Sequence, residues 1–217
     1  MFKSSLSRPF TIAVSALLLP LSITLAHTEP KAIKEYKFDL NGISDIAIHG
    51  GVGSINVIHT DAKQASVVLE ITQKNHHWWK SDIDLDSVEL HDRRSSGRLT
   101  LRQTDEDINI EWTVELPSIA QTSIELGVGS IDAEIADSDV HVNLGVGEVK
   151  LRMPEQSAGD IRLNTGVGDA KLLGGEITRH KREMISQKIS GHGKGSKDID
   201  VTVGVGDIRV TLEPLRH

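Results

Sequence analysis

The sequence GVGDIRV, residues 204–210, is one of five near-copies of the same heptapeptide in this chain of 217 residues. The others are GVGSINV at 51–57, GVGSIDA at 127–133, GVGEVKL at 145–151 and GVGDAKL at 166–172. A phosphate-binding glycine loop is needed once and carries Lys and Ser or Thr after its glycines, a pattern that none of the five copies has. A unit that recurs five times is instead typical of repetitive architectures, so this repeat decides the fold.

Apolar residues alternate on both sides of the repeat, which predicts strands with one buried face. Before the copy at 145 they are Val142 and Leu144, and the valine inside the motif continues the alternation, so we expect it on the buried face. The phase then slips by one, because the next apolar residues are Val149 and Leu151. A strand that changes parity contains a bulge or corner, and glycine reaches the backbone angles needed there. The predicted structural corners are Gly51, Gly53, Gly127, Gly129, Gly145, Gly147, Gly166, Gly168, Gly204 and Gly206.

The spacing of the copies predicts a stack of coils. Their first glycines are 76, 18, 21 and 38 residues apart, close to four, one, one and two times a period of 19. We therefore expect an all-β solenoid with one coil per repeat, stacked in chain order and paired in parallel about 4.8 Å apart. Residues 54–120 largely lack the motif, and there we expect either coils with other corners or a strand region that caps the open end.

Residues 1–26 have the layout of a secretory signal peptide. A basic start with Lys3 and Arg8 precedes an apolar run, which ends at the small residue Ala26. We expect cleavage there, which leaves residues 27–217 as a single domain in the periplasm, secreted or at the cell surface. No later segment is apolar enough over a sufficient length to predict a membrane-spanning helix.

Composition narrows the function classes further. The chain has no cysteine, which excludes disulfides and a lipid-anchored cysteine. The first 26 residues hold two basic and no acidic residues, so the remainder has a formal net charge of −9, against −7 for the whole chain. An acidic surface repels phosphate backbones, so we expect no nucleic-acid partner. Aromatic residues are only 3% of the chain, which predicts a core of Ile, Val and Leu.

A resemblance to the bacterial putative-adhesin β-strand-repeat family, also called toastrack, covers roughly residues 40–213. The segments that carry it are INIEWTVELPSIAQTSIELGVGSIDAEIADSDVHVNLGVGEVKLRM at 108–153, GDIRLNTGVGDAKLL at 159–173 and DIDVTVGVGDIRVTL at 198–212. The resemblance implies a right-handed, single-stranded parallel β-helix that is exported or envelope-associated. It also implies a scaffold or adhesin without catalytic residues, in some members linked to envelope stress responses.

Carboxylates at the corners raise an enzymatic alternative. Glu148 and Asp169 follow the second glycine of two copies that we expect on adjacent coils. Retaining glycosidases place two carboxyl groups about 5–5.5 Å apart, so a carbohydrate-active β-helix enzyme is one alternative. Two residues further on lie Lys150, Lys171 and Arg209, which favour a solvated lattice of ion pairs instead. We therefore predict no catalytic residue and no enzyme.

Metal sites are a second alternative. The corners differ from the calcium-binding nonapeptide repeat in both spacing and the position of Asp. Cleavage after Ala26 would make His27 the N-terminus, and an N-terminal histidine chelates copper with a second imidazole. The candidates for that second imidazole are His49, His59, His76, His77 and His91. No spacing favours any of them, so we predict no metal and no cofactor, and a periplasmic metal-binding protein remains an alternative.

Two segments are candidates for binding a partner. Trp78 and Trp79 either cap one end of the core or form an exposed platform. Residues 171–197 carry seven basic and two acidic residues, and Arg179, Lys181 and Arg182 are its densest group. This segment is either a solvated insertion or a contact for anionic lipid headgroups or cell-wall polymers. The predicted function is that of a non-enzymatic, adhesin-like scaffold whose partner is an unidentified envelope protein, glycan or lipid surface.

Overall fold

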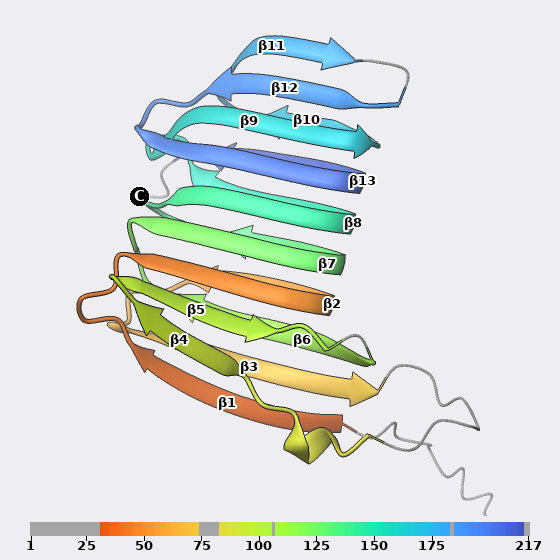
Figure 1. Ribbon diagram of the computed structural model, residues 1–217. Coiled ribbons are helices and arrows are strands. Elements are labelled where there is room, and N and C mark those ends of the chain that lie inside the picture. The colour runs from red at the N-terminus through yellow and green to blue at the C-terminus, as the bar shows by residue number, and fades with distance from the viewer. Residues whose placement is uncertain (1–30, 74–82, 106, 183–184, 215–217) are drawn as a thin grey trace, which may run out of the picture.

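The computed structural model describes residues 31–73, 83–105, 107–182 and 185–214, which form a rack of strands (Figure 1). Its only helix within these ranges is the short 3-10 turn η1 (Leu85–Ser87), and no helix in the described residues is long and apolar enough to cross a membrane. The strands are β1 (Lys31–Asp39), β2 (Asp45–His59), β3 (Gln64–Gln73), β4 (His91–Ser95), β5 (Arg98–Gln103), β6 (Ile108–Leu116), β7 (Gln121–Glu134), β8 (Asp139–Pro154), β9 (Ala158–Val167), β10 (Ala170–Leu173), β11 (Glu176–Arg182), β12 (Gln187–His192) and β13 (Lys197–Glu213).

The long central strands bend at their GVG motif, so each contributes to two layers (Figure 1). We call the layer made by the residues before the bend the front sheet and the layer after it the back sheet. The front sheet runs β4-β5-β2-β7-β8-β13-β9-β12-β11. The back sheet runs β1-β3-β6-β2-β7-β8-β13-β10. The core lies between them.

The core consists of columns of aliphatic side chains that run along the stack. One column in the front sheet joins Ile48, Ile124, Val142, Val201 and Leu163, which are register neighbours and all buried. Burying each such side chain contributes about 1.5–3 kcal/mol relative to leaving it in water. The alternation of apolar residues thus produces two layers of one bent sheet that share a core.

We call the part of the chain around each GVG copy a rung. The spatial order of the rungs differs from the expected order. Residues 51–57 on β2 lie directly beside residues 127–133 on β7. The strands between them in the chain, β3 to β6, lie on the other side of β2. The last strand, β13, lies between β8 and β9, so the copies at 145 and 166 are not neighbours. The arithmetic of a 19-residue period was therefore wrong, because the extra residues leave the stack and build its ends.

Both ends of the rack are antiparallel, so the predicted purely parallel single-stranded solenoid is wrong in this respect. The strand β3 pairs antiparallel with β1 and β6, and β12 pairs antiparallel with β9 and β11. Within residues 54–120, β5 and β6 form a parallel coil whose corner lacks the GVG motif, whereas β3 and β4 are antiparallel additions. This segment therefore contains both a coil with another corner and a strand cap.

Candidate functional site

The second glycines of the five copies lie side by side at the bend of the rack. Gly147 has a φ of 141°, and a Cβ built on it would lie 1.7 Å from the carbonyl oxygen of Gly129. The same distance separates a Cβ on Gly129 from the carbonyl oxygen of Gly53. The backbones of neighbouring rungs therefore touch at the bend, and no side chain fits between them.

The valines of the motif form an exposed row along this edge. In spatial order the valine row consists of Val52, Val128, Val146, Val205 and Val167, each in register with the next. Four of the side chains are 43–48% exposed, and Val52 is partly exposed. The expectation of a buried valine was wrong, because the parity slip begins before the valine and turns it outward at the apex of the bend.

The carboxylates beside the valine row are held by neighbouring groups. The Lys150 Nζ lies 3.0 Å from the Glu148 Oε2, and the Arg182 Nη2 lies 3.0 Å from the Asp169 Oδ1. The backbone N–H of Asp169 donates a hydrogen bond of 2.9 Å to the Oδ1 of Asp207. Of the basic residues expected in an ion-pair lattice, Lys150 forms its pair, whereas Lys171 and Arg209 make no ion pair within the described residues and line a shallow hollow of about 80 Å³.

The expected neighbouring pair of Glu148 and Asp169 does not exist. Glu148 is the register partner of Asp207 on β13, and β13 separates β8 from the strands β9 and β10. Strands two places apart in a sheet are about 10 Å apart, which exceeds the carboxyl spacing of a retaining glycosidase. The adjacency on which the enzymatic alternative rested was therefore wrong.

The basic candidates lie mainly on the outermost strand of the front sheet. Arg179, Lys181 and Arg182 belong to β11, whose residues are all exposed, and Arg182 forms the ion pair with Asp169. Lys194 forms an ion pair with Glu155, with a Nζ–Oε2 distance of 2.9 Å. The basic residues of 171–197 are thus spread over several strands. Charges on an edge strand also block pairing with another sheet.

Several other candidates lie outside the described residues. They are His27, His76, His77, Trp78 and Trp79. Among the residues that the structure describes, no group of three or more His, Cys, Asp or Glu side chains is arranged to hold a metal ion.

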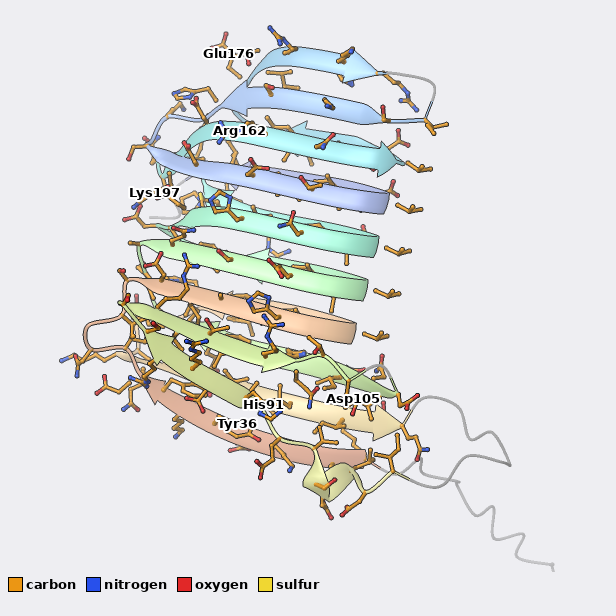
Figure 2. The ribbon with its side chains drawn as sticks, in the orientation of Figure 1. Tyr36, His91, Asp105, Arg162, Glu176 and Lys197 are labelled. Atoms are coloured by element: carbon orange, nitrogen blue, oxygen red, sulfur yellow. The ribbon has the colours of Figure 1, made fainter. Side chains whose placement is uncertain are left out.

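The structure also reveals a hollow that the sequence reasoning missed. It measures about 380 Å³ and opens on the outer face of the front sheet, near the end where Figure 2 labels His91. We call it the arginine hollow, and it is lined by His49, His91, Asp92, Arg93, Thr100 and Arg102. A short polar alternation, His91-x-Arg93 followed by Thr100-x-Arg102, is the one sequence signal that marks it.

Elsewhere on the front sheet an arginine is held by two carboxylates. The Arg162 Nε lies 3.3 Å from the Asp200 Oδ2, and its Nη2 lies 3.6 Å from the Asp198 Oδ2. The hydrogen bond to Asp200 is the main cause that raises the pKa of the Arg162 guanidinium above its usual value. The two carboxylates therefore position the Arg162 guanidinium.

Solved structures and one family model match this chain. The fold is similar to a crystal structure of a putative cell adhesion protein from Clostridium sporogenes, with 19% identity, a TM-score of 0.49, and coverage of 86% of this chain and 100% of the other. It is also similar to a putative adhesin from Bacteroides fragilis, with 10% identity, a TM-score of 0.25, and coverage of 82% and 97%. No curated protein matches the sequence. Residues 28–173 match the model of one family, so this chain belongs to the family described as the N-terminal domain of toast_rack, DUF2154.

Proposed function

We propose that this protein is an exported, non-enzymatic scaffold of the bacterial envelope that acts by binding a protein partner, as an adhesin does. The valine row carries the proposal, because an ordered line of exposed aliphatic side chains favours contact with a partner protein. The signal-like residues 1–26 support export to the periplasm or cell surface. The resemblance to the toastrack family adds a role in envelope stress responses to the same proposal.

The chemistry of the row favours a protein over a glycan. Neighbouring valines stand about 4.8 Å apart, a spacing that matches the side chains of another β-rich surface. Glycans are bound by exposed aromatic rings and dense hydrogen-bonding groups, whereas among the described aromatic residues Trp112 and Phe38 are buried and Tyr36 is partly buried. Covering each half-exposed valine contributes about 1 kcal/mol, so the row supplies several kcal/mol in total.

The test measures binding of labelled protein, residues 27–217, to isolated envelopes. The triple variant Val128→Thr, Val146→Thr and Val205→Thr keeps the shape and β-branching of the row but adds a hydroxyl to each side chain. We expect its affinity to fall about tenfold or more, since each threonine must lose water to bind.

The matched control replaces three apolar residues elsewhere that are exposed at least as much as Val146, as Ile33→Thr, Leu173→Thr and Ile177→Thr. We expect this control to bind like the wild type, and protease treatment of the envelopes to abolish binding. Equal binding by both triple variants would exclude the valine row as the contact. Binding that survives protease treatment would point to a glycan or lipid and refute a protein partner.

A further inference from the structure

The arginine hollow arises from the register of three strands. On β5, Leu99 and Leu101 are buried in the core, so the alternating residues Thr100 and Arg102 face outward. His91 on β4 is the register partner of Arg102. Cross-strand neighbours on one face are about 4.5–5.5 Å apart at Cβ, so these groups form one cluster.

The other two basic groups join this cluster from either side. His49 on β2 is the register partner of Arg102 on the other edge of β5. Arg93 on β4 is the register partner of Thr100 and lies diagonally across from Arg102. Thr100 and its neighbour Ala47 have short side chains, which leaves room between the longer ones. Two guanidinium groups and two imidazoles therefore surround the space.

The arginines of this cluster lack carboxylate partners, in contrast to others on the rack. Among the described residues, Arg93 and Arg102 make no ion pair or side-chain hydrogen bond, whereas Arg152 and Arg162 are paired with carboxylates. Of the two acidic residues nearby, Asp92 lines the hollow, and the Oε2 of Glu125 lies 2.7 Å from the Nδ1 of His49. With neutral imidazoles, the lining residues carry two guanidinium charges against the single carboxylate of Asp92, a formal net charge of +1, on a chain that is acidic overall.

We propose that the arginine hollow binds a phosphate group carried by a small ligand or a lipid headgroup. Guanidinium groups bind phosphate oxygens through paired N–H donors, and the Thr100 hydroxyl and the imidazole N–H groups add further donors. A volume of about 380 Å³ exceeds what one phosphate fills, which leaves room for the group attached to it. The site lies on the face of the front sheet and is separate from the valine row, so this inference does not rest on the proposed function.

The test uses residues 27–217 and titrates pyrophosphate by calorimetry, with NMR detection of the imidazole signals of His49 and His91. The variant Arg93→Gln with Arg102→Gln removes the two unpaired guanidinium groups from an exposed surface. We expect at least a tenfold rise in the dissociation constant and the loss of the imidazole shifts. The control Arg179→Gln with Lys188→Gln removes the same charge at the far end of the front sheet and is expected to change the dissociation constant less than twofold.

Vesicles separate the two sources of the phosphate. Binding to phosphatidylglycerol vesicles but not to phosphatidylcholine vesicles would assign a lipid headgroup, and binding of pyrophosphate alone would assign a soluble ligand. The proposal is overturned if the wild type binds neither probe, or if both double variants weaken binding equally. It is also overturned if pyrophosphate binds the wild type without shifting the His49 and His91 signals, and this result requires no variant.

Discussion

At the scale of single residues, the bend of the rack is set by backbone contact between rungs. The second glycine of the motif has a positive φ and faces the carbonyl of the rung beside it, as Gly147 faces Gly129. Both features exclude a side chain, but they do so for different reasons. The φ value strains any L-residue by about 1–2 kcal/mol, whereas the missing space forces the strands apart. The glycines are therefore required by packing more than by conformation.

This distinction predicts that substitution by alanine lowers the free energy of unfolding by different amounts at two glycines. Gly147→Ala combines a positive φ with a Cβ 1.7 Å from a backbone oxygen, and we expect the free energy of unfolding to fall by more than about 4 kcal/mol. Gly42→Ala has a φ of 74° but no atom within 4 Å of its Cβ, so we expect a loss of about 1 kcal/mol. Urea denaturation followed by circular dichroism measures both, and equal losses would refute the packing argument.

At the scale of single elements, the short edge strand β10 pairs with a side chain where it has no neighbouring strand. One side of β10 pairs with β13, and no described strand pairs with the other. On that side the buried side chain of Gln187 forms two hydrogen bonds with Ala170. Its Nε2 donates a hydrogen bond of 3.1 Å to the carbonyl of Ala170, and its Oε1 accepts one of 3.0 Å from the Ala170 N–H. A side-chain amide thus replaces one residue of a missing strand.

Gln187→Leu keeps the volume of this side chain but leaves two buried backbone groups of Ala170 without partners. Each unsatisfied group costs about 1–3 kcal/mol, so we expect the free energy of unfolding to fall by about 3 kcal/mol. Lys188→Leu, one residue further on an exposed position, is the control and is expected to change stability by about 0.5 kcal/mol or less. Chemical denaturation compares the two, and a Gln187→Leu variant as stable as the control would contradict this account.

At the scale of the whole molecule, the last strand fills a slot in the middle of the stack. β13 pairs in parallel with β8 on one side and with β9 and β10 on the other. It belongs to residues 174–217, which lie beyond the family match at 28–173. The matched part of the chain therefore contains two rungs that are held together by a strand from outside it.

Removing residues 197–217 tests this dependence. The core columns would lose Val201, Val203, Ile208 and Val210, and two neighbouring rungs would lose their pairing partner. We expect the shortened chain to show no cooperative thermal transition by calorimetry. A synthetic peptide of residues 197–213 is expected to restore the transition, whereas a scrambled peptide is not. A cooperative transition at the wild-type temperature without the peptide would show that the rack folds without β13.

The sequence by itself determined the strands, their buried faces and the bend in each rung. These features depend on neighbours within a few residues, such as the alternation of Val142 and Leu144 and the glycines that follow them. Part of the site was also visible, since the acidic and basic columns at the corners predicted ion pairs such as Lys150 with Glu148. The arginine hollow could not be predicted from its polar alternation alone, because the two segments meet only through the pairing of β4 with β5.

Only the tertiary structure decided the order of the rungs, the exposure of the valine row and the surface on which unpaired arginines meet. The five repeats present nearly identical backbone edges, so local sequence cannot tell which copy pairs with which. The choice is made between segments far apart in the chain, which places β13 beside β8 and β2 beside β7. Side chains far apart in the chain, such as His49 and Arg102, become neighbours only once that choice has been made.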